Sequence, residues 1–338
     1  MKSEAKVLSM SFRSGFVCIL GRPNAGKSTL LNALVGEKLA IISPKPQTTR
    51  NRIQGIIHIP KGKVKGKGKD GAQIVLVDTP GVHKPDSSLG RKMMVEVREA
   101  LEGCDVVLLL MDVTQKLDPR DHFALDLLRK TGAKPYLVLN KIDLVREKSK
   151  LLPLIDERRK LHDFAEVLPI SARKSSGLDT LLNAVVEALP AGPAYFPEDE
   201  VTDQPARFMA AEIIREQILL NTSEEIPYAT TVIIENFEEG KRLTRIGAVI
   251  YCEREGQKGI LVGKGGLMLK KVGTSARLQI ERMLQTKVFL ELFVKVEPGW
   301  RDSRRFIDEL DWRRQLEQRM LVRSEGGPVL PASETTKN

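Results

Sequence analysis

The residues of this 338-residue chain best suited to chemistry form a glycine-rich segment with one lysine and one hydroxyl side chain, Gly21-Arg-Pro-Asn-Ala-Gly-Lys-Ser28. It has the spacing GxxxxGK[ST] and follows an apolar run at residues 16–20, as a loop between a strand and a helix requires. In such a loop, successive backbone N–H groups surround phosphates at the positive end of the helix. Lys27 would reach the outer phosphates, and the Ser28 hydroxyl would bind Mg²⁺. The predicted nucleotide contacts here are Gly21, Arg22, Pro23, Asn24, Ala25, Gly26, Lys27, Ser28 and Thr29.

Two further polar segments come directly after apolar runs. Asp78-Thr-Pro-Gly81 follows residues 74–77, which would place a carboxylate on the metal side and a backbone N–H near a γ-phosphate. Asn140-Lys-Ile-Asp143 follows residues 136–139, where the aspartate can accept hydrogen bonds from N1–H and the exocyclic amine of guanine. Adenine lacks this pair of donors, so Asp143 would select GTP over ATP. The predicted contacts are Asp78, Thr79, Pro80, Gly81, Asn140, Lys141 and Asp143.

A fourth segment, Ser171-Ala-Arg-Lys174, follows the next apolar run and could close over the base through backbone N–H groups of Ser171, Ala172 and Arg173. Any one of the four segments could be an ordinary loop at the end of a strand. All four occur in this order, each where a strand ends, and ligands of open α/β sheets bind at that edge. Together they predict a guanine-nucleotide site.

The order of apolar runs divides the chain into two parts. Residues 15–189 alternate strands near 16–20, 74–78, 105–112, 136–140 and 167–170 with helices near 27–35, 89–102, 119–131 and 177–189. This alternation predicts an α/β domain with a mainly parallel sheet. The later order is a helix near 205–220, strands near 228–236 and 246–253, two helices flanking 263–266, a strand at 288–296 and a helix at 303–319. The second part is therefore an α+β unit of the order αββααβ.

These patterns set the predicted domain boundaries. The nucleotide domain spans 14–189, a linker with three prolines spans 190–204, and the α+β domain with its C-terminal helix spans 205–320. Residues 1–13 and 324–338 have little to bury and are predicted to be flexible tails.

Composition and charge limit the class of protein. The longest apolar run, residues 106–111, is far shorter than the ~20 residues of a membrane span, and the N-terminus carries no apolar signal core, so we expect a cytoplasmic protein. The three cysteines lack metal-ligand spacing and are expected to be free thiols. The net charge is +10, and residues 240–287 hold eleven basic residues against three acidic ones. This stretch is a candidate surface for a polyanion.

The segment Gly263-Lys-Gly-Gly266 lies within the basic stretch, between two predicted helices. Such a G-x-x-G loop lets an RNA backbone approach without obstruction by side chains. The predicted RNA contacts are Gly263, Lys264, Gly265, Gly266, Lys270, Lys271 and Arg277. A lysine-glycine run at residues 61–69 is either an RNA-contacting finger or a solvated extension of a hairpin, and we favour the second because such runs are readily solvated.

On these motifs the chain resembles the Era family of ribosome-assembly GTPases, within the translation-factor-related class. Gln47-Thr-Thr-Arg50 matches the first switch segment of the family, and residues 289–296 with Trp300-Arg-Asp302 are similar to its KH-type RNA-binding domain. The similarity runs from about residue 14 to about residue 318. It implies an Mg²⁺-dependent GTPase that binds the 3′ end of 16S ribosomal RNA and acts in assembly of the small ribosomal subunit, with the nucleotide state gating RNA binding.

The catalytic residues depart from the commonest GTPase pattern. Gly81 is followed by Val82, where many GTPases carry a glutamine that positions the attacking water. The resemblance implies catalysis by backbone groups and a K⁺ ion held partly by Asn24, although Asn24 could equally be a turn-forming residue. The catalytic candidates are Asn24, Lys27 and Gly81, and the metal ligands are Ser28, Asp78 and Thr49, which we favour over Thr48.

Two rival functions follow from the same features. A GTPase of RNA modification would need a reactive-cysteine or metal constellation in the second domain, and the sequence has none. A switch with peripheral membrane association would need a broad apolar stripe on residues 303–319, which offer only five apolar side chains. We therefore expect a monomer whose partner is the small ribosomal subunit.

Overall fold

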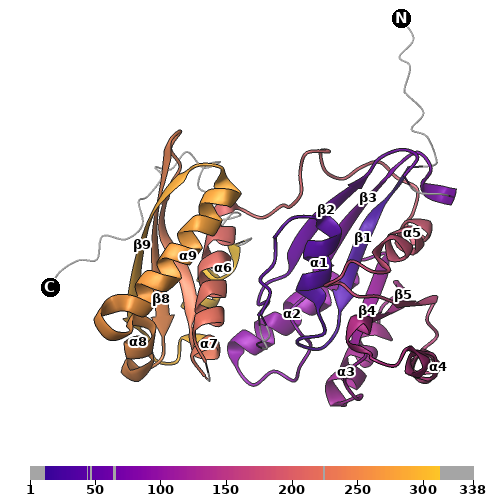
Figure 1. Cartoon of the computed structure of the whole chain (residues 1–338), viewed down its shortest axis with the longest axis horizontal. Coiled ribbons are helices and arrows are strands. Elements are labelled where there is room, and N and C mark those ends of the chain that lie inside the picture. The colour runs from indigo at the N-terminus through magenta and orange to yellow at the C-terminus, as the bar shows by residue number, and fades with distance from the viewer. Residues whose placement is uncertain (1–11, 44, 46–47, 64–65, 224, 313–338) are drawn as a thin grey trace, which may run out of the picture. The chain divides into compact units, whose positions relative to one another are not determined.

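The computed structural model describes residues 12–43, 45, 48–63, 66–223 and 225–312, and these divide into two compact units. One unit contains the described residues up to Lys84 together with Met93–Asp203, and the other contains Pro85–Lys92 and the residues from Gln204 onward. Figure 1 shows both units, and each is described here by itself.

The first unit is built on a six-stranded sheet within the described residues, in the order β2-β3-β1-β4-β5-β6. All neighbouring pairs are parallel except β2 with β3. The strands are β1 (Arg13–Leu20), β2 (Ile53–Ile59), β3 (Ala72–Asp78), β4 (Val106–Asp112), β5 (Lys134–Asn140) and β6 (Glu166–Pro169). Every residue of β3 and β4 is buried, as expected for a parallel sheet covered on both faces.

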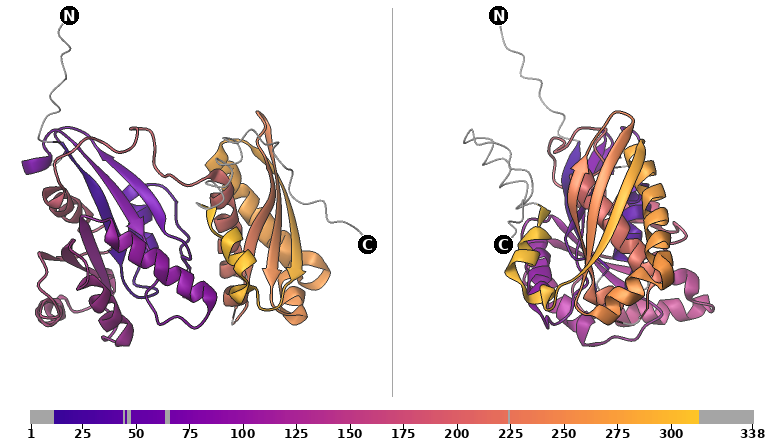
Figure 2. Two further views of the ribbon diagram at one scale, coloured as in Figure 1. Left: turned by 180° about the vertical axis from the view of Figure 1, so that it is seen from behind. Right: turned by 90° about the vertical axis from the view of Figure 1, so that its left-hand side faces the viewer.

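Helices cover both faces of this sheet (Figures 1 and 2). They are α1 (Lys27–Val35), α2 (Ser88–Glu102), α3 (Pro119–Leu128), α4 (Leu151–Arg159) and α5 (Leu178–Ala188). Leu137 and Leu139 of β5 point to the face that α2 and α3 cover. Tyr136 points to the other face and donates its hydroxyl to the Ala184 carbonyl of α5. Successive side chains of a strand point to opposite faces of the sheet, so neighbouring residues of β5 pack against helices on different faces.

A buried glutamine of β3 holds the segment that follows α5. The Gln73 amide oxygen accepts hydrogen bonds from the backbone N–H groups of Tyr195 (2.6 Å) and Phe196 (3.1 Å), and its amide nitrogen donates to the Phe196 carbonyl (2.7 Å). The ring centroid of Tyr195 lies 5.0 Å from that of Phe16. We call residues 192–202 the strap, because side chains and backbone of the first unit bind it along this length.

The strap continues along β2, at the edge of the sheet. The Ile56 N–H donates to the Val201 carbonyl (2.9 Å), and the Thr202 hydroxyl donates to the Gln54 carbonyl (2.7 Å). The strap thereby covers part of a strand edge that would otherwise present unpaired backbone groups. Most of the predicted linker at 190–204 thus contacts the first unit.

The second unit contains α6 (Ala206–Asn221), α7 (Ile226–Ala229), β7 (Thr231–Glu238), β8 (Leu243–Cys252), α8 (Glu255–Val262), α9 (Leu267–Leu284), β9 (Lys287–Val296) and α10 (Arg304–Glu309). The strand order is β7-β8-β9, with β7 antiparallel and β9 parallel to β8. One face of the sheet packs on α6 and α9 around a core that includes Ile214, Ile250 and Ile280. Trp300 is fully buried after β9 and donates its indole N–H to the Ala229 carbonyl (2.9 Å).

The predicted α/β unit followed by an αββααβ unit is confirmed. The strand predicted at 228–236 begins instead at Thr231, because Pro227 stands in the first turn of α7 and residues 228–229 complete that short helix. The helix predicted at 303–319 is interrupted at Leu310 and Asp311, and residues 313–319 lie outside the described residues. The sequence pattern did not predict α4, whose first turn contains Pro153.

The other predictions on composition concern thiols, membranes and tails. Cys18, Cys104 and Cys252 are free in the structure. Across the described part of the chain, no helix has the length and apolar character to cross a bilayer. The predicted tail at 324–338 and residues 1–11 of the other tail lie outside the described residues. The domain boundaries remain a prediction.

We expect Gln73→Met to loosen the strap. The apolar side chain would leave the backbone groups of Tyr195 and Phe196 without buried partners, and each such group costs about 1–3 kcal/mol. The free energy of unfolding from urea titration should fall accordingly, and chymotrypsin should cleave after Tyr195 at a higher rate. Gln54→Met on β2 is the control, because only the backbone carbonyl of Gln54 binds the strap. Equal cleavage of both variants would contradict the role of Gln73.

Candidate functional site

A cleft of about 600 Å³ lies at the carboxyl ends of the parallel strands of the first unit. Most residues of the predicted phosphate loop line this cleft. The switch segment, the loops at the strand ends and the 171–174 segment each provide at least one further lining residue. The predicted residues that line it are Arg22, Pro23, Asn24, Gly26, Lys27, Ser28, Thr29, Thr49, Gly81, Lys141 and Arg173, together with Thr48. Gly21, Ala25, Asp78, Thr79, Pro80, Asn140, Asp143, Ser171 and Ala172 do not line this cleft. Gln47 lies outside the described residues.

The three predicted metal ligands lie together. The Ser28 hydroxyl donates to Asp78 Oδ2 (2.7 Å) and lies 2.9 Å from the Thr49 hydroxyl, which donates to the same carboxylate oxygen (3.3 Å). Thr48 instead donates to the Lys45 carbonyl (2.6 Å). Among the described residues, Asp78 Oδ1 is buried without a hydrogen-bond partner. Hydroxyl and carboxylate oxygens with one unsatisfied acceptor form a donor set that fits Mg²⁺.

Lys27 and Asp78 are a buried pair of opposite charges at the base of the loop. The Lys27 ammonium donates to the carbonyls of Gly21 (3.1 Å) and Arg22 (3.2 Å). Burial raises the pKa of the Asp78 carboxyl, and the positive charge of Lys27 opposes that rise. Burial also lowers the pKa of Lys27, and the negative charge of Asp78 opposes that change. Because the site is shielded from water, the electrostatic attraction between Lys27 and a bound phosphate would be stronger there than at the protein surface.

Gly81 lies against the phosphate loop. A Cβ atom at Gly81 would approach Pro23 to 2.8 Å, so only glycine permits this spacing. The next residue, Val82, donates its N–H to the Gly21 carbonyl (3.1 Å), and its side chain is fully buried in the core. Val82 therefore presents no polar side chain to the cleft.

The predicted base-recognition residues connect the phosphate loop to the 171–174 segment. Asn140 donates to the Ala25 carbonyl (2.9 Å) and accepts from the Ala172 N–H (3.0 Å). The Ser171 hydroxyl donates to Asp143 Oδ1 (2.6 Å), which orients a carboxylate that is otherwise exposed. The structure thus links all these residues at one edge of the sheet, as the motif order predicts.

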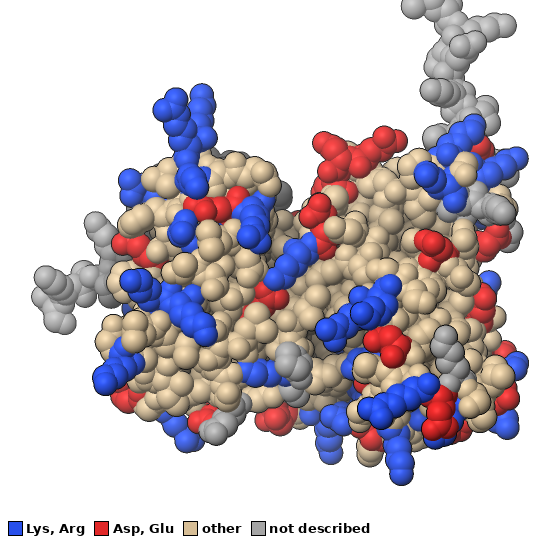
Figure 3. Space-filling model, in the orientation of Figure 1, with Lys and Arg blue, Asp and Glu red and all other residues tan. Residues whose placement is uncertain are grey.

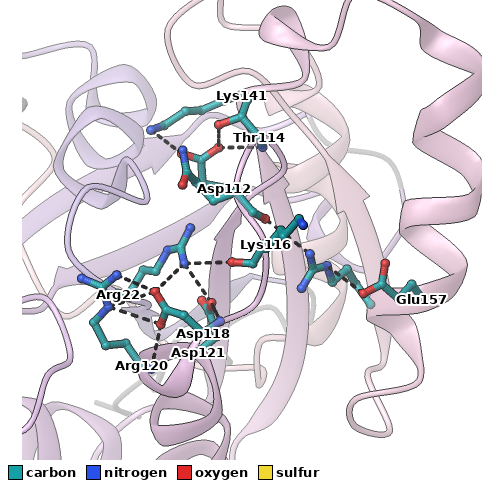
Figure 4. A network of polar contacts seen from close by, with 11 residues as sticks. Arg22, Asp112, Thr114, Lys116, Asp118, Arg120, Asp121, Lys141 and Glu157 are labelled. Atoms are coloured by element: carbon teal, nitrogen blue, oxygen red, sulfur yellow. Dashed lines mark hydrogen bonds and ion pairs between the residues drawn. The ribbon is translucent and has the colours of Figure 1, made fainter.

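Two loop residues differ in what their side chains do. Arg22 is buried, and its guanidinium binds Asp118 and Asp121 at the start of α3 (Figure 4). Asn24 has a φ of 63°, a conformation that asparagine tolerates better than most residues. Its carbonyl accepts from the Lys141 ammonium (2.8 Å). The backbone of Asn24 therefore forms a turn, and this does not conflict with the proposed role of its side chain in holding a K⁺ ion.

Some residues that line the cleft have no motif to mark them. Asp112 ends β4, Gln115 lies between β4 and α3, and Arg120 lies in the first turn of α3. Ile41, Ile42 and Ser43 come from the segment after α1. Asp112 binds Lys141 (2.7 Å); burial alone would raise the pKa of Asp112, but the hydrogen bonds from Lys141 and Thr114 lower it. Its place at the end of β4 is the signal that could have identified it, because Asp78 and Asn140 end their strands in the same way.

The G-x-x-G loop of the second unit lies between α8 and α9, as predicted. Lys264 and Gly265 are exposed, and a Cβ atom at Gly265 would meet nothing within 4 Å. Lys270 and Lys271 are exposed on α9, whereas Arg277 is half-buried and binds Glu281 (2.9 Å). Figure 3 shows Lys and Arg side chains spread over the visible face of this unit. The loop is therefore open to a large anionic ligand.

The lysine-glycine run joins β2 to β3. Lys61 forms an ion pair with Asp70 (3.2 Å), and the Gly62 N–H donates to the Lys69 carbonyl (3.0 Å). Residues 64 and 65 lie outside the described residues. These contacts fit the favoured interpretation, a solvated extension of a hairpin.

Known protein families match both the nucleotide-binding part and the second part of the chain. A family described as 50S ribosome-binding GTPase matches residues 16–141, and the KH domain family matches residues 225–301. GTPase Era of Syntrophus aciditrophicus (strain SB) is 48% identical over 306 residues, covering 90% of this chain and 96% of the relative. GTPase Era of Stenotrophomonas maltophilia (strain K279a) is 49% identical over 290 residues, covering 86% and 94%.

Solved structures give the same result. A crystal structure of an Aquifex aeolicus Era variant bound to GDP.AlF4- superposes with a TM-score of 0.83 at 40% identity, covering 89% of this chain and 99% of that one. A structure of Era in complex with MgGDPNP and nucleotides 1506–1542 of 16S ribosomal RNA superposes with a TM-score of 0.84, also at 40% identity, with the same coverage. The resemblance noted from the motifs is confirmed, and the chain belongs to the Era family of GTPases.

Proposed function

We propose that the first unit binds GTP and GDP with Mg²⁺ in the cleft beside the phosphate loop and hydrolyses GTP. The observation that carries this proposal is the convergence of Ser28, Thr49 and Asp78 on one side of the loop. The related Era structures contain GDP.AlF4- and MgGDPNP. Mg²⁺, when bound, neutralises charge on phosphate oxygens.

The residues of the chain have distinct parts in this proposal. Lys27 attracts the outer phosphates from a buried position. The Gly81 N–H faces the γ-phosphate, and the close approach of Gly81 to Pro23 brings it to the loop. Asp143 accepts from guanine while Ser171 holds its carboxylate in place. Asn140, Ala172 and Arg173 close the base end of the site.

Hydrolysis on this proposal uses backbone groups and a monovalent cation. Val82 is fully buried, so its side chain does not orient water. Asn24 stands in the loop beside the position where charge develops, and it would hold part of a K⁺ ion there. Such a cation takes the place of an arginine finger.

The second unit, on the same proposal, binds 16S ribosomal RNA near its 3′ end through the G-x-x-G loop. The related Era structure holds nucleotides 1506–1542 of that RNA. On this proposal the nucleotide state gates RNA binding during assembly of the small ribosomal subunit. We also propose that the chain acts in the cytoplasm as a monomer. Peripheral membrane association would require residues 303–319 to offer an apolar face, but Phe306 and Trp312 are buried.

Asp143→Asn should lose affinity for GTP and gain affinity for XTP, because the new amide donates where the carboxylate accepted. The loss should be about a hundredfold or more, since the asparagine amide would face the two guanine donors with a donor of its own and leave them unpaired. Competition of labelled GDP by GTP and XTP measures both changes. Asp156→Asn, an exposed change on α4, serves as the control. A variant that binds GTP like the wild-type protein would rule out the guanine assignment.

GTP turnover should be faster in K⁺ than in Na⁺ at equal ionic strength, by about tenfold if the cation replaces a charge-stabilising group. Asn24→Gly should remove the difference, because glycine retains the backbone conformation at φ 63° and deletes only the amide. Phosphate release in matched KCl and NaCl buffers is the measurement. Equal rates in both salts for the wild-type protein would exclude the ion from hydrolysis.

The double variant Lys264→Asp with Gly265→Asp should bind RNA far more weakly, because two carboxylates would occupy the closest approach of the backbone. Gly265 has a φ of 60°, where any side chain is strained, but aspartate tolerates this conformation better than most residues and no atom lies within 4 Å of its Cβ position. Each lost phosphate contact should also flatten the slope of log affinity against log salt by about 0.7. Filter binding to a 16S 3′-end fragment at several salt concentrations tests both.

The matched control carries the same change of charge on α8, as Gly256→Asp with Lys258→Asp. A Cβ atom at Gly256 meets nothing within 4 Å. Intrinsic GTP hydrolysis without RNA should stay near wild type in both variants, and circular dichroism should show a folded second unit. Unchanged RNA binding by the folded loop variant would refute the assignment of the RNA site.

A further inference from the structure

Arg22 belongs to the phosphate loop and lines the cleft, but its guanidinium forms ion pairs with two aspartates outside the loop. Its side chain is 8% exposed, and Nη1 donates to Asp118 Oδ2 (3.0 Å), Asp121 Oδ2 (3.0 Å) and the Lys116 carbonyl (3.3 Å). The guanidinium thus reaches about a hundred residues along the chain, to the start of α3. Figure 4 shows these side chains gathered beneath the loop.

The start of α3 is held by hydrogen bonds of its own. The Asp118 carboxylate accepts from the Arg120 N–H (2.8 Å), and Asp121 accepts from the Asp118 N–H (3.0 Å), so the two form a reciprocal cap. The guanidinium of Arg120 also binds Asp118, which lowers the pKa of that carboxyl to about 2 and keeps it charged near neutral pH. The two carboxylates therefore form a fixed anionic anchor for Arg22.

The segment between β4 and α3 holds the loop at a second point. Asp112, at its start, binds the Lys141 ammonium (2.7 Å), and the same ammonium donates to the Asn24 carbonyl (2.8 Å). Residues 112–121 thus fix Arg22 directly and Asn24 through Lys141. Pro23, which meets Gly81, lies between these two points.

The backbone of Arg22 connects this anchor to the loop lysine, because its carbonyl accepts from the Lys27 ammonium (3.2 Å). A shift of Arg22 would therefore move a lysine that contacts the outer phosphates. Stability is a poor explanation for such a pair, since apolar residues of similar volume often replace a buried ion pair without loss. Directional bonds that fix a position are the feature that apolar packing lacks.

We propose that Arg22 is a positioning residue for GTP hydrolysis: held by Asp118 and Asp121, it sets the place of Lys27 and of the loop backbone from Arg22 to Asn24. This inference rests on the proposed GTP site. Misplacing a reacting group by about 1 Å can lower a rate a hundredfold while binding changes little. The expected defect therefore lies in turnover more than in affinity.

The experiment uses the full chain with three variants on one background. Arg22→Met removes the guanidinium but keeps much of the side-chain volume; Asp121→Asn with Arg22→Met also removes the carboxylate left without its partner. Arg129→Met is the matched control, because Arg129 lies just after α3 and forms an exposed pair with Asp126. The kcat of GTP hydrolysis at saturating GTP, the GDP affinity and the melting temperature are measured for each.

We expect Arg22→Met to lower kcat by about tenfold to a hundredfold, with GDP affinity within about threefold of wild type. The double variant should melt at a higher temperature than Arg22→Met, since no buried charge is left unpaired, yet its kcat should stay low. Arg129→Met should match wild type. Recovery of kcat together with the melting temperature in the double variant would overturn the proposal, as would a normal kcat in folded Arg22→Met. Failure of the wild-type protein to hydrolyse GTP would instead refute the proposed function.

Discussion

The site depends on one geometric constraint, that parallel strands all end at the same edge of their sheet. β1, β3, β4, β5 and β6 run in one direction, so the polar residues that follow them meet without any long-range pairing of their own. Ser28 and Asp78, fifty residues apart, form a hydrogen bond for this reason. The hydrophobic runs of the strands thereby determine which polar groups become neighbours.

The polar groups that meet at this edge are partly removed from water, and burial shifts the pKa values of the charged ones. Lys27 and Asp78 are both buried, and each opposes the pKa change that burial imposes on the other. Asp78 also retains one carboxylate oxygen without a hydrogen-bond partner among the described residues. The site is thus arranged for ligands of both signs, a polyphosphate and a metal ion.

Much of this arrangement could be predicted because it depends on local pattern. The four segments at strand ends and the αββααβ order are visible in apolar periodicity and glycine spacing. Thr49, rather than Thr48, lies beside Ser28, although its role as a metal ligand remains a prediction. Contacts between polar residues that are far apart in the sequence could not be predicted, because no sequence pattern marks them. Arg22 and Asp121 lie ninety-nine residues apart, and nothing in either neighbourhood marks them as partners. The break at Leu310 was not predicted either, since residues 303–319 are rich in helix formers and contain no glycine or proline that would mark a helix end.

The strap has a consequence for how the chain folds during synthesis. β6, the last strand of the sheet, ends at Pro169, but the amide oxygen of Gln73 and the β2 edge acquire their partners only when residues 195–202 have been made. At the usual rate of translation, roughly two to seven seconds separate these events. During that interval the β2 edge and the amide oxygen of Gln73 have no partners from the strap, although the amide nitrogen can still contact His58 of β2. Translation beyond β6, up to the start of the second unit, is therefore needed before the β2 edge and the Gln73 oxygen are paired.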